Sequence, residues 1–228
     1  NSNASSVHKE VYQHAKAIGE LLLPKSRAYH EIWLDGEKLS TTEEEVEPIY
    51  GKTYLPRKFK IGIAIPPVND VDIYSQDLGF IALLENEKLI GFNVLVGGGM
   101  GATHGNANTY PRLADAIGFC TPEQVLDVAE QVVKIQRDYG NRSDRKLSRL
   151  KYTIDAYGLE WFKTELSSRM QSSLSPSIAV TFIHRGDQFG WQQSDDGLWH
   201  NTLYIENGRV KDNPAQLMRT GLKAIAEL

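Results

Sequence analysis

Cysteine is almost absent from this sequence: Cys120 is the single one among 228 residues. One thiol excludes an intrachain disulfide framework and any metal site built from several cysteines of this chain. The scarcity is typical of a protein kept in a reducing compartment, and we expect a cytoplasmic protein. Cys120 stands beside a predicted helix start, where we interpret it as a small buried hydrophobic residue.

Long apolar runs and an excess of positive charge are also missing. No run approaches the roughly 20 apolar residues that cross a bilayer, so the sequence predicts no membrane partner. The formal net charge is -4, and any anion-binding role therefore depends on a local basic cluster. Aromatic residues are not interleaved with the basic ones, which argues against nucleic acid as a partner.

Both ends of the sequence look interrupted. Residues 1–4, NSNA, resemble an expression-tag remnant, and neither an initiator methionine nor a signal-type apolar segment is present. The last residues, LMRTGLKAIAEL, stop within a helical pattern that has no capping glycine. We expect the chain to be a piece of a longer protein.

The spacing of apolar residues predicts an α+β fold. Nearly continuous apolar strands over 78–84 and 88–96, joined by a short turn, indicate a sheet covered on both faces. The other expected segments are a helix over 7–22, a strand over 28–34, an acidic loop over 40–48, a strand over 58–65, a helix over 122–138 that opens with a Thr121/Gln124 capping box, a helix over 143–157 capped by Ser143, and a helix over 159–169.

A serine-rich stretch with Pro176 reads as a linker after the last of these helices. Beyond it, Asn207-Gly208 predicts the turn of a hairpin, and Pro214 predicts the start of a final helix. We therefore divide the chain into the tag remnant (1–4), a main domain (5–170), a linker (171–177) and a second, incomplete unit (178–228).

The strand over 58–65 carries an unusual pair of lysines. Lys58 and Lys60 are two residues apart, so they leave the same face with α-carbons about 6.6 Å apart. Two cations so close repel each other unless an anion lies between them. Gly62 and Ala64 continue that face and leave room for a flat, bulky group. The alternative is an exposed edge strand protected by its lysines.

A glycine-rich loop, GGGMGATHGN, follows the strand over 88–96. Consecutive glycines allow backbone N–H groups to approach an anion or a ring closely. His104, within this loop, is a candidate donor to an anion. The loop matches neither a Walker loop nor a dinucleotide fingerprint, so a flexible turn with a surface histidine is the alternative.

A third cluster contains four basic residues, Arg142, Arg145, Lys146 and Arg149, at spacings that predict one face of the helix over 143–157. Cations near the positive end of a helix dipole are unfavourable unless they bind an anion. The alternative is a solvated basic face. Together the three clusters indicate a bulky, planar, polyanionic ligand.

At these residues the sequence resembles the siroheme-dependent sulfite/nitrite reductase family, and in particular the central segment of its hemoprotein subunits. The resemblance is carried by TYLPRKFKIGIAIPPVNDVDI, LIGFNVLVGGGMGATHGN and RDYGNRSDRKLSRLKYTID, and it extends in one collinear order over nearly the whole chain. It implies one siroheme-type α+β repeat with a mixed sheet, followed by half of a ferredoxin-like unit. It also implies an oxidoreductase of sulfur assimilation that reduces sulfite to sulfide with six electrons, at a siroheme coupled to a 4Fe–4S cluster.

By this resemblance Lys58 and Lys60 are catalytic and contact sulfite. The residues implied in cofactor binding are Arg57, Gly97, Gly98, Gly99, Met100, His104, Arg145, Lys146 and Arg149. The electron donor implied is an NADPH flavoprotein or a ferredoxin.

One departure from the family is decisive. The four cysteines that hold the cluster in the family are absent, and Cys120 matches none of them. We therefore expect this piece to bind no cofactor by itself and to be inactive alone. The alternatives are a piece of a siroheme nitrite reductase and a non-catalytic anion-binding module.

Overall fold

The computed structural model describes residues 5–25, 33–35, 37–38 and 47–227. Its contacts separate a first unit, Ser5–Gly186, from a second that begins at Asp187. Residues 178–186 thus belong with the first unit. The assignment of the two parts as a siroheme-type domain and half of a ferredoxin-like unit stays a prediction.

A four-stranded mixed sheet, in the order β3-β5-β6-β7, forms the centre of the first unit. Strand β3 (Ile61–Ala64) is parallel to β5 (Leu78–Glu85), whereas β6 (Lys88–Val96) is antiparallel to both β5 and β7 (Asp115–Cys120). The turn between β5 and β6 has positive φ at Asn86 and Glu87, as a tight hairpin requires. The mixed α+β prediction and both long strands are confirmed.

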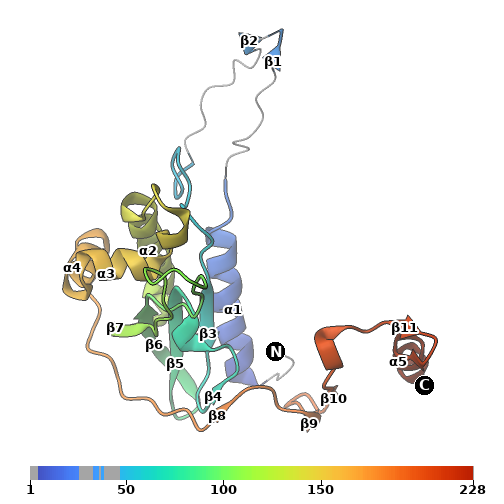
Figure 1. The fold of residues 1–228 in the computed structure, drawn as a ribbon. Helices are drawn as coiled ribbons and strands as arrows, with labels where there is room; N and C mark the ends of the chain where they lie inside the picture. The colour runs from blue at the N-terminus through green and yellow to red at the C-terminus, as the bar shows by residue number, and fades with distance from the viewer. Residues whose placement is uncertain (1–4, 26–32, 36, 39–46, 228) are drawn as a thin grey trace. The chain divides into compact units, whose positions relative to one another are not determined.

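Helices cover one face of this sheet (Figure 1). They are α1 (Ser6–Leu21), α2 (Val125–Tyr139), which is preceded by the 3-10 turn η2 (Pro122–Gln124), α3 (Leu150–Tyr157) and α4 (Leu159–Arg169). Alternate residues of the strands, such as Phe80 and Phe92, join Val128 and Val132 of α2 in the larger apolar core. The Thr121/Gln124 capping box is present, and α4 has the predicted bounds.

A second, smaller core lies on the opposite face. It contains Ile81 and Leu95 from the sheet together with Ile73 from the 3-10 turn η1 (Ile73–Ser75). Val180 and Phe182 pack against it from the segment that follows α4. Both faces of the sheet are therefore covered, as the continuous apolar strands predict.

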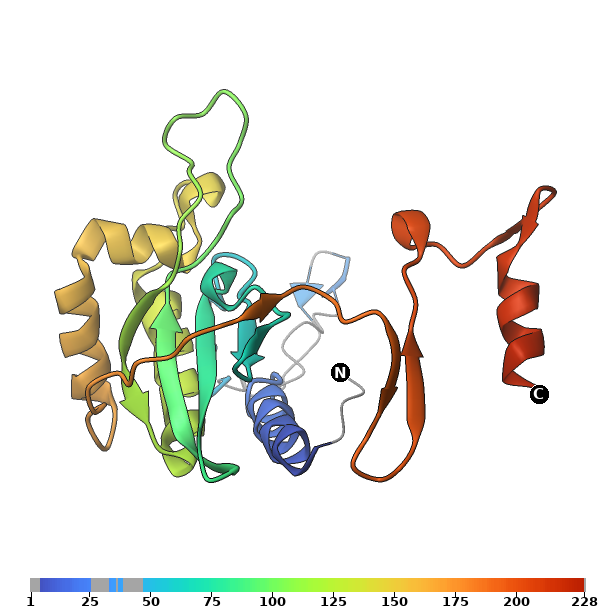
Figure 2. The same ribbon diagram turned by 90° about the horizontal axis from the view of Figure 1, so that it is seen from below.

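We call residues 171–186 the strap, because they run across the strands in Figure 2, where they are orange. Ser175 exchanges two backbone hydrogen bonds with Phe119 of the edge strand β7, at 2.7 and 2.9 Å. The side chain of Asn93 bonds both the N–H and the C=O of Ile178, at 3.0 and 2.6 Å. The strap ends in β8 (His184–Arg185), which pairs with β4 (Val68–Asn69). The stretch expected to be a linker, 171–177, is thus packed along a sheet edge that offered free backbone groups.

Short elements make up the rest of the described chain. β1 (Trp33–Leu34) pairs with β2 (Glu37–Lys38). The predicted strand over 28–34 and acidic loop over 40–48 otherwise lie outside the described residues. The second unit contains β9 (Gly190–Gln193), β10 (Trp199–Thr202), η4 (Glu206–Gly208), β11 (Asp212–Asn213), β12 (Gln216–Leu217) and α5 (Met218–Ala226).

Two expectations in this second unit are wrong. Asn207 and Gly208 form the left-handed turn, with φ of 56° and 63°, but the residues on either side of it are not paired with each other in the described chain. β10 pairs with β9 instead. The final helix begins at Met218 and not at Pro214, because the Asn213 side chain accepts hydrogen bonds from the next free backbone N–H groups and holds a turn there.

Cys120 is fully buried in the larger core, as predicted. Burial raises the pKa of its thiol to about 12, whereas an unfolded thiol ionises near 8.5. The neutral thiol's contribution to stability is therefore complete below about pH 8.5 and is lost as the pH rises toward 12, because only the unfolded chain releases its proton there.

We predict that the stability advantage of the wild type over Cys120→Ala shrinks by about 2 kcal/mol between pH 8 and pH 10. Urea unfolding at several pH values measures it, and ionisation of other groups cancels in the comparison. Ellman's reagent should leave the folded protein unlabelled at pH 8 and label one thiol in urea. Rapid labelling without urea would contradict this account of Cys120.

Candidate functional site

Lys58 and Lys60 lie just before β3, which begins at Ile61. The predicted alternation still holds, because Phe59 and Ile61 pack against the larger core while both lysines are exposed. Within the described chain, neither lysine ammonium group nor the half-buried Arg57 guanidinium has a hydrogen-bond or ion-pair partner. These three cations are available to an external anion.

The space expected beside Gly62 and Ala64 is filled by the protein itself. A Cβ on Gly62 would lie 2.9 Å from Cγ of Gln76, and Ala64 packs against Ile73 in the smaller core. The small residues admit the η1 segment to this face of β3. The expectation that they leave room for a ring is wrong.

Asp77 is the residue around which the candidate clusters meet. Its carboxylate is fully buried and accepts hydrogen bonds from the backbone N–H of Lys60 (2.9 Å) and from Arg149 (Nη2 at 2.8 Å, Nε at 3.1 Å). Its backbone carbonyl accepts from the N–H of Gly97 at 2.9 Å. Burial raises the pKa of Asp77, while hydrogen bonds and charge from Arg149, and then Lys60, lower it. One residue thus joins the lysine segment, the triple glycine and Arg149.

The three glycines are needed for packing within the chain. Their N–H groups donate to the carbonyls of Asp77, Gln76 and Arg112 at 2.9, 2.9 and 2.8 Å. A Cβ on Gly98 would lie 2.3 Å from the carbonyl oxygen of Tyr74, and one on Gly99 would lie 2.8 Å from Nη1 of Arg149. The expectation that these N–H groups are free for an anion is wrong.

The basic cluster does not share a helix face, and Ser143 does not cap a helix. The side chain of Asn141 accepts from the N–H groups of Ser143 and Asp144, and the Asp144 side chain accepts from the N–H of Lys146. These local bonds compete with an α-helix. Residues Arg145–Leu147 form the 3-10 turn η3, and α3 begins only after Arg149.

The four basic residues have different surroundings. Arg145 and Lys146 are exposed on η3, and their side chains have no polar partner among the residues described here. Arg149 is neutralised by Asp77 and also donates to the carbonyl of Gly98 at 3.3 Å, which leaves Nη1 without an acceptor in the described structure. The anion that the sequence pattern predicts beside the basic cluster is therefore, at Arg149, the carboxylate of Asp77.

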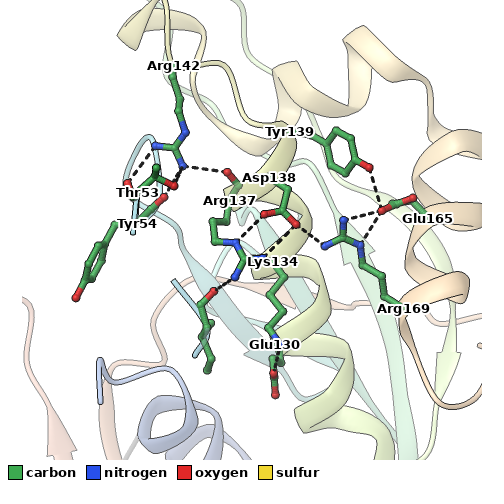
Figure 3. A network of polar contacts seen from close by, with 11 residues as sticks. Thr53, Tyr54, Glu130, Lys134, Arg137, Asp138, Tyr139, Arg142, Glu165 and Arg169 are labelled. Carbon is green, nitrogen blue, oxygen red and sulfur yellow. Dashed lines mark hydrogen bonds and ion pairs between the residues drawn. The ribbon is translucent and has the colours of Figure 1, made fainter. Parts of the chain in front are cut away.

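Arg142 belongs to a different network, shown in Figure 3. It donates to the carbonyl and hydroxyl oxygens of Thr53 and to the carbonyl of Tyr54, while Arg137 donates to the carbonyl of Ile49. The residues that lead into Arg57 are thereby attached to the C-terminal end of α2. Asp138, Arg169 and Glu165 extend the network to α4.

Lys151 has a buried role that the sequence patterns missed. Its ammonium group donates to the carbonyl oxygens of Gly99 (3.0 Å), Gly101 (2.9 Å) and Tyr110. It also lies 4.8 Å from the centre of the Tyr152 ring. Burial, followed by the charge of Arg149, lowers the pKa of Lys151. Its spacing from Ile154, one helical turn later, was the signal that Lys151 faces the interior.

Lys151 and Arg112 together close the glycine-rich loop. Arg112 forms ion pairs with Asp115 (2.6 Å) and Asp155 (2.9 Å) and donates to the carbonyl of Gly97 at 3.1 Å. The loop beyond them projects past the sheet in Figure 2, in green. Met100 and His104 lie exposed on it.

The structure thus brings together the main chain of Lys60, the three glycines and the Arg149 side chain. Within the described chain, no hydrogen bond or ion pair joins this group to Arg57, Lys58, His104, Arg145 or Lys146. Across the residues that the structure covers, three or more His, Cys, Asp or Glu side chains nowhere gather as a metal site would need. None of the described helices is long and apolar enough to cross a membrane.

A family model described as the nitrite and sulphite reductase 4Fe-4S domain matches residues 14–174. Proteins of Lysinibacillus sphaericus (strain C3-41) and Bacillus subtilis (strain 168), both described as sulfite reductase (NADPH) hemoprotein beta-component, are 58% and 56% identical to the whole chain. The chain spans about 40% of the length of each. The solved structure of Mycobacterium tuberculosis NirA protein matches with a TM-score of 0.54 and 30% identity, over 64% of this chain and 26% of NirA.

Replacing Lys151 by methionine should lower the free energy of unfolding by about 2–4 kcal/mol, because one buried and two partly buried carbonyls lose the donor that this buried side chain supplies. Lys146→Met is the matched control, since that exposed side chain has no polar partner within the described residues, and it should change stability by less than about 0.5 kcal/mol. Urea unfolding measures both. Equal effects of the two substitutions would contradict the buried role of Lys151.

Proposed function

The chain belongs to the nitrite and sulphite reductase 4Fe-4S domain family, and on this basis we propose that it is part of the hemoprotein of an assimilatory, NADPH-dependent sulfite reductase. In the intact protein the reaction is the six-electron reduction of sulfite to sulfide. The observation that carries the proposal is the set of cations at Arg57, Lys58 and Lys60 without partners in the described chain, of which Lys60 is bound through its backbone N–H to Asp77.

Lys58 and Lys60 are the proposed catalytic residues. Sulfite is a small anion whose oxygens gain negative charge as electrons are added, and fixed ammonium groups stabilise that charge. Protonated lysines also supply protons to oxygens that leave as water. Both ammonium groups are exposed and form no hydrogen bond or ion pair with the described residues, which fits this role.

Siroheme carries many carboxylates, and the described residues fit it in part. Arg57, Arg145 and Lys146 have free cationic groups that suit those carboxylates. Met100 and His104 are exposed on the loop that follows the three glycines. The N–H groups of Gly97, Gly98 and Gly99 already donate to backbone carbonyls, so these glycines can contribute only a backbone without side chains that a ring could approach closely. Arg149 can contribute only its Nη1, because its other nitrogens are hydrogen-bonded. When bound, this cofactor would supply the electrons for sulfite.

A 4Fe–4S cluster does not fit the residues of this chain. Such a cluster is held by four cysteine thiolates, whereas the sequence has the single Cys120, which is buried and whose pKa is raised to about 12. We propose that its ligands come from elsewhere in a protein whose relatives are more than twice this length. The chain alone is then inactive.

Sulfite and an electron donor are the proposed partners. The relatives' description includes NADPH, which favours a flavoprotein donor over a ferredoxin. We propose a cytoplasmic location, in keeping with the reducing conditions that the chemistry requires.

The test uses the full-length protein with its cofactors and methyl viologen as reductant. We expect siroheme absorption bands that shift with sulfite, and sulfide as the product. Lys58→Met and Lys60→Met should each lower kcat/KM for sulfite roughly 100-fold, because each removes a cation from the developing charge. Lys9→Met, on an exposed part of α1, should leave it unchanged.

The absence of siroheme bands, or full activity of both lysine variants, would overturn the proposal. A marked preference for nitrite over sulfite would identify nitrite as the substrate, while the proposed site would be unchanged. Binding of sulfite without reduction would favour an anion-binding module instead.

A further inference from the structure

Asp77 is a buried charge for which the proposed chemistry has no direct use. Its side chain is fully buried, and a buried carboxylate is costly unless donors surround it. Three N–H donors do so here, from Lys60 and Arg149. Packing alone therefore does not explain why a charged residue is buried at this position.

Lys60 is held on both sides of its backbone. Its carbonyl accepts from the N–H of Leu78 at 3.1 Å, which continues the parallel β3–β5 pairing by one residue. Its own N–H has no main-chain acceptor in the described structure and instead donates to Oδ2 of Asp77 at 2.9 Å. The carboxylate thus fixes the backbone of Lys60 where the regular strand has already ended.

The same carboxylate fixes what lies next to Lys60. It binds Arg149 through two nitrogens, and this bidentate geometry sets the plane of the guanidinium. Nη1 of Arg149 would lie 2.8 Å from a Cβ on Gly99, so the glycine and the arginine are in close contact. Displacing Asp77 would release the lysine segment and the arginine together.

We propose that Asp77 is a positioning residue that holds Lys60 at the distance from the bound anion that the reduction requires. This inference rests on the proposed function, because it assigns Asp77 a role through a lysine that contacts sulfite. Asp77 itself touches neither substrate nor cofactor.

Charge and position predict opposite results for Asp77→Asn. Removing a negative charge beside an anion site would by itself strengthen sulfite binding. Displacement of Lys60 weakens sulfite binding instead. The asparagine amide would point its N–H₂ group at one of the donors that Asp77 now accepts, and this repulsion moves the lysine segment. A displaced reacting group reduces catalysis steeply. The sign of the change therefore separates the two effects.

The experiment compares wild type, Asp77→Asn, Lys60→Met and the double variant in the full-length holoenzyme, with siroheme absorbance and Tm recorded for each. Asp77→Asn should raise the sulfite KM and lower kcat/KM by about 10- to 100-fold. In the Lys60→Met background, Asp77→Asn should lower kcat/KM for sulfite by less than about threefold, because the lysine through which Asp77 acts is gone.

Asp138→Asn is the matched control. Asp138 also pairs with two arginines, Arg137 and Arg169, but among the described residues no bond joins it to Lys58 or Lys60. It should leave the sulfite KM unchanged in both backgrounds. Equal effects of Asp138→Asn and Asp77→Asn would overturn the inference.

Failure of the inference is distinguishable from failure of the proposed function. If wild type reduces sulfite and Lys60→Met is impaired, but Asp77→Asn is unimpaired or its cost is equal in both backgrounds, the positioning role is overturned and the function stands. If wild type does not reduce sulfite, both are overturned.

Amide hydrogen exchange on the wild-type holoenzyme covers the case in which Asp77→Asn does not fold. The N–H of Lys60 should exchange slowly because Asp77 accepts it, whereas the N–H of Lys58, which has no acceptor in the described chain, should exchange rapidly. Equal, rapid exchange at both positions would overturn the inference without any substitution.

Discussion

The buried carboxylate of Asp77 is the constraint on which the candidate site depends. It lies immediately before β5, the strand that pairs with β3 on one side and β6 on the other. Through its side chain and its carbonyl it binds the segments on both sides and the residue before α3. An ion pair in this position contributes little net stability in itself, and its effect is to give three loops one common arrangement.

Lys151 performs a complementary task on the other side of the triple glycine. A lysine ammonium group has three donors, and here each meets a different backbone carbonyl of one loop. Asp77 satisfies donors and Lys151 satisfies acceptors, so the buried polar groups around the glycines are paired from both directions. The exposed ammonium groups of Lys58 and Lys60 therefore lie next to a buried region in which Asp77 already pairs with Arg149 and Lys151 is bound by backbone carbonyls.

The fold of the first unit was largely predictable because its signals are local and repeated. Alternating and continuous apolar patterns located β5, β6, α1, α2 and α4, and the Thr121 capping box located the start of a helix. The sequence indicated which segments form the candidate site, but it did not indicate which residues of those segments contact one another. No local pattern shows that Arg149 is neutralised by a residue 72 positions away, or that the glycine N–H groups are occupied. The start of α3 was missed because Asn141 and Asp144 bind the backbone there, which competes with helix formation.

The strap shows how a polar, serine-containing stretch can be a fixed part of a fold. Its backbone is bound at the β7 edge by Phe119, over the neighbouring strand β6 by Asn93, and at its other end by β4. Each attachment holds one or two residues in register, so the number of residues between the attachments is fixed by the distance from one to the next. An insertion or a deletion between two of these attachments would therefore pull a bound residue out of register, so a stretch that resembles a spacer has a length fixed by its hydrogen bonds.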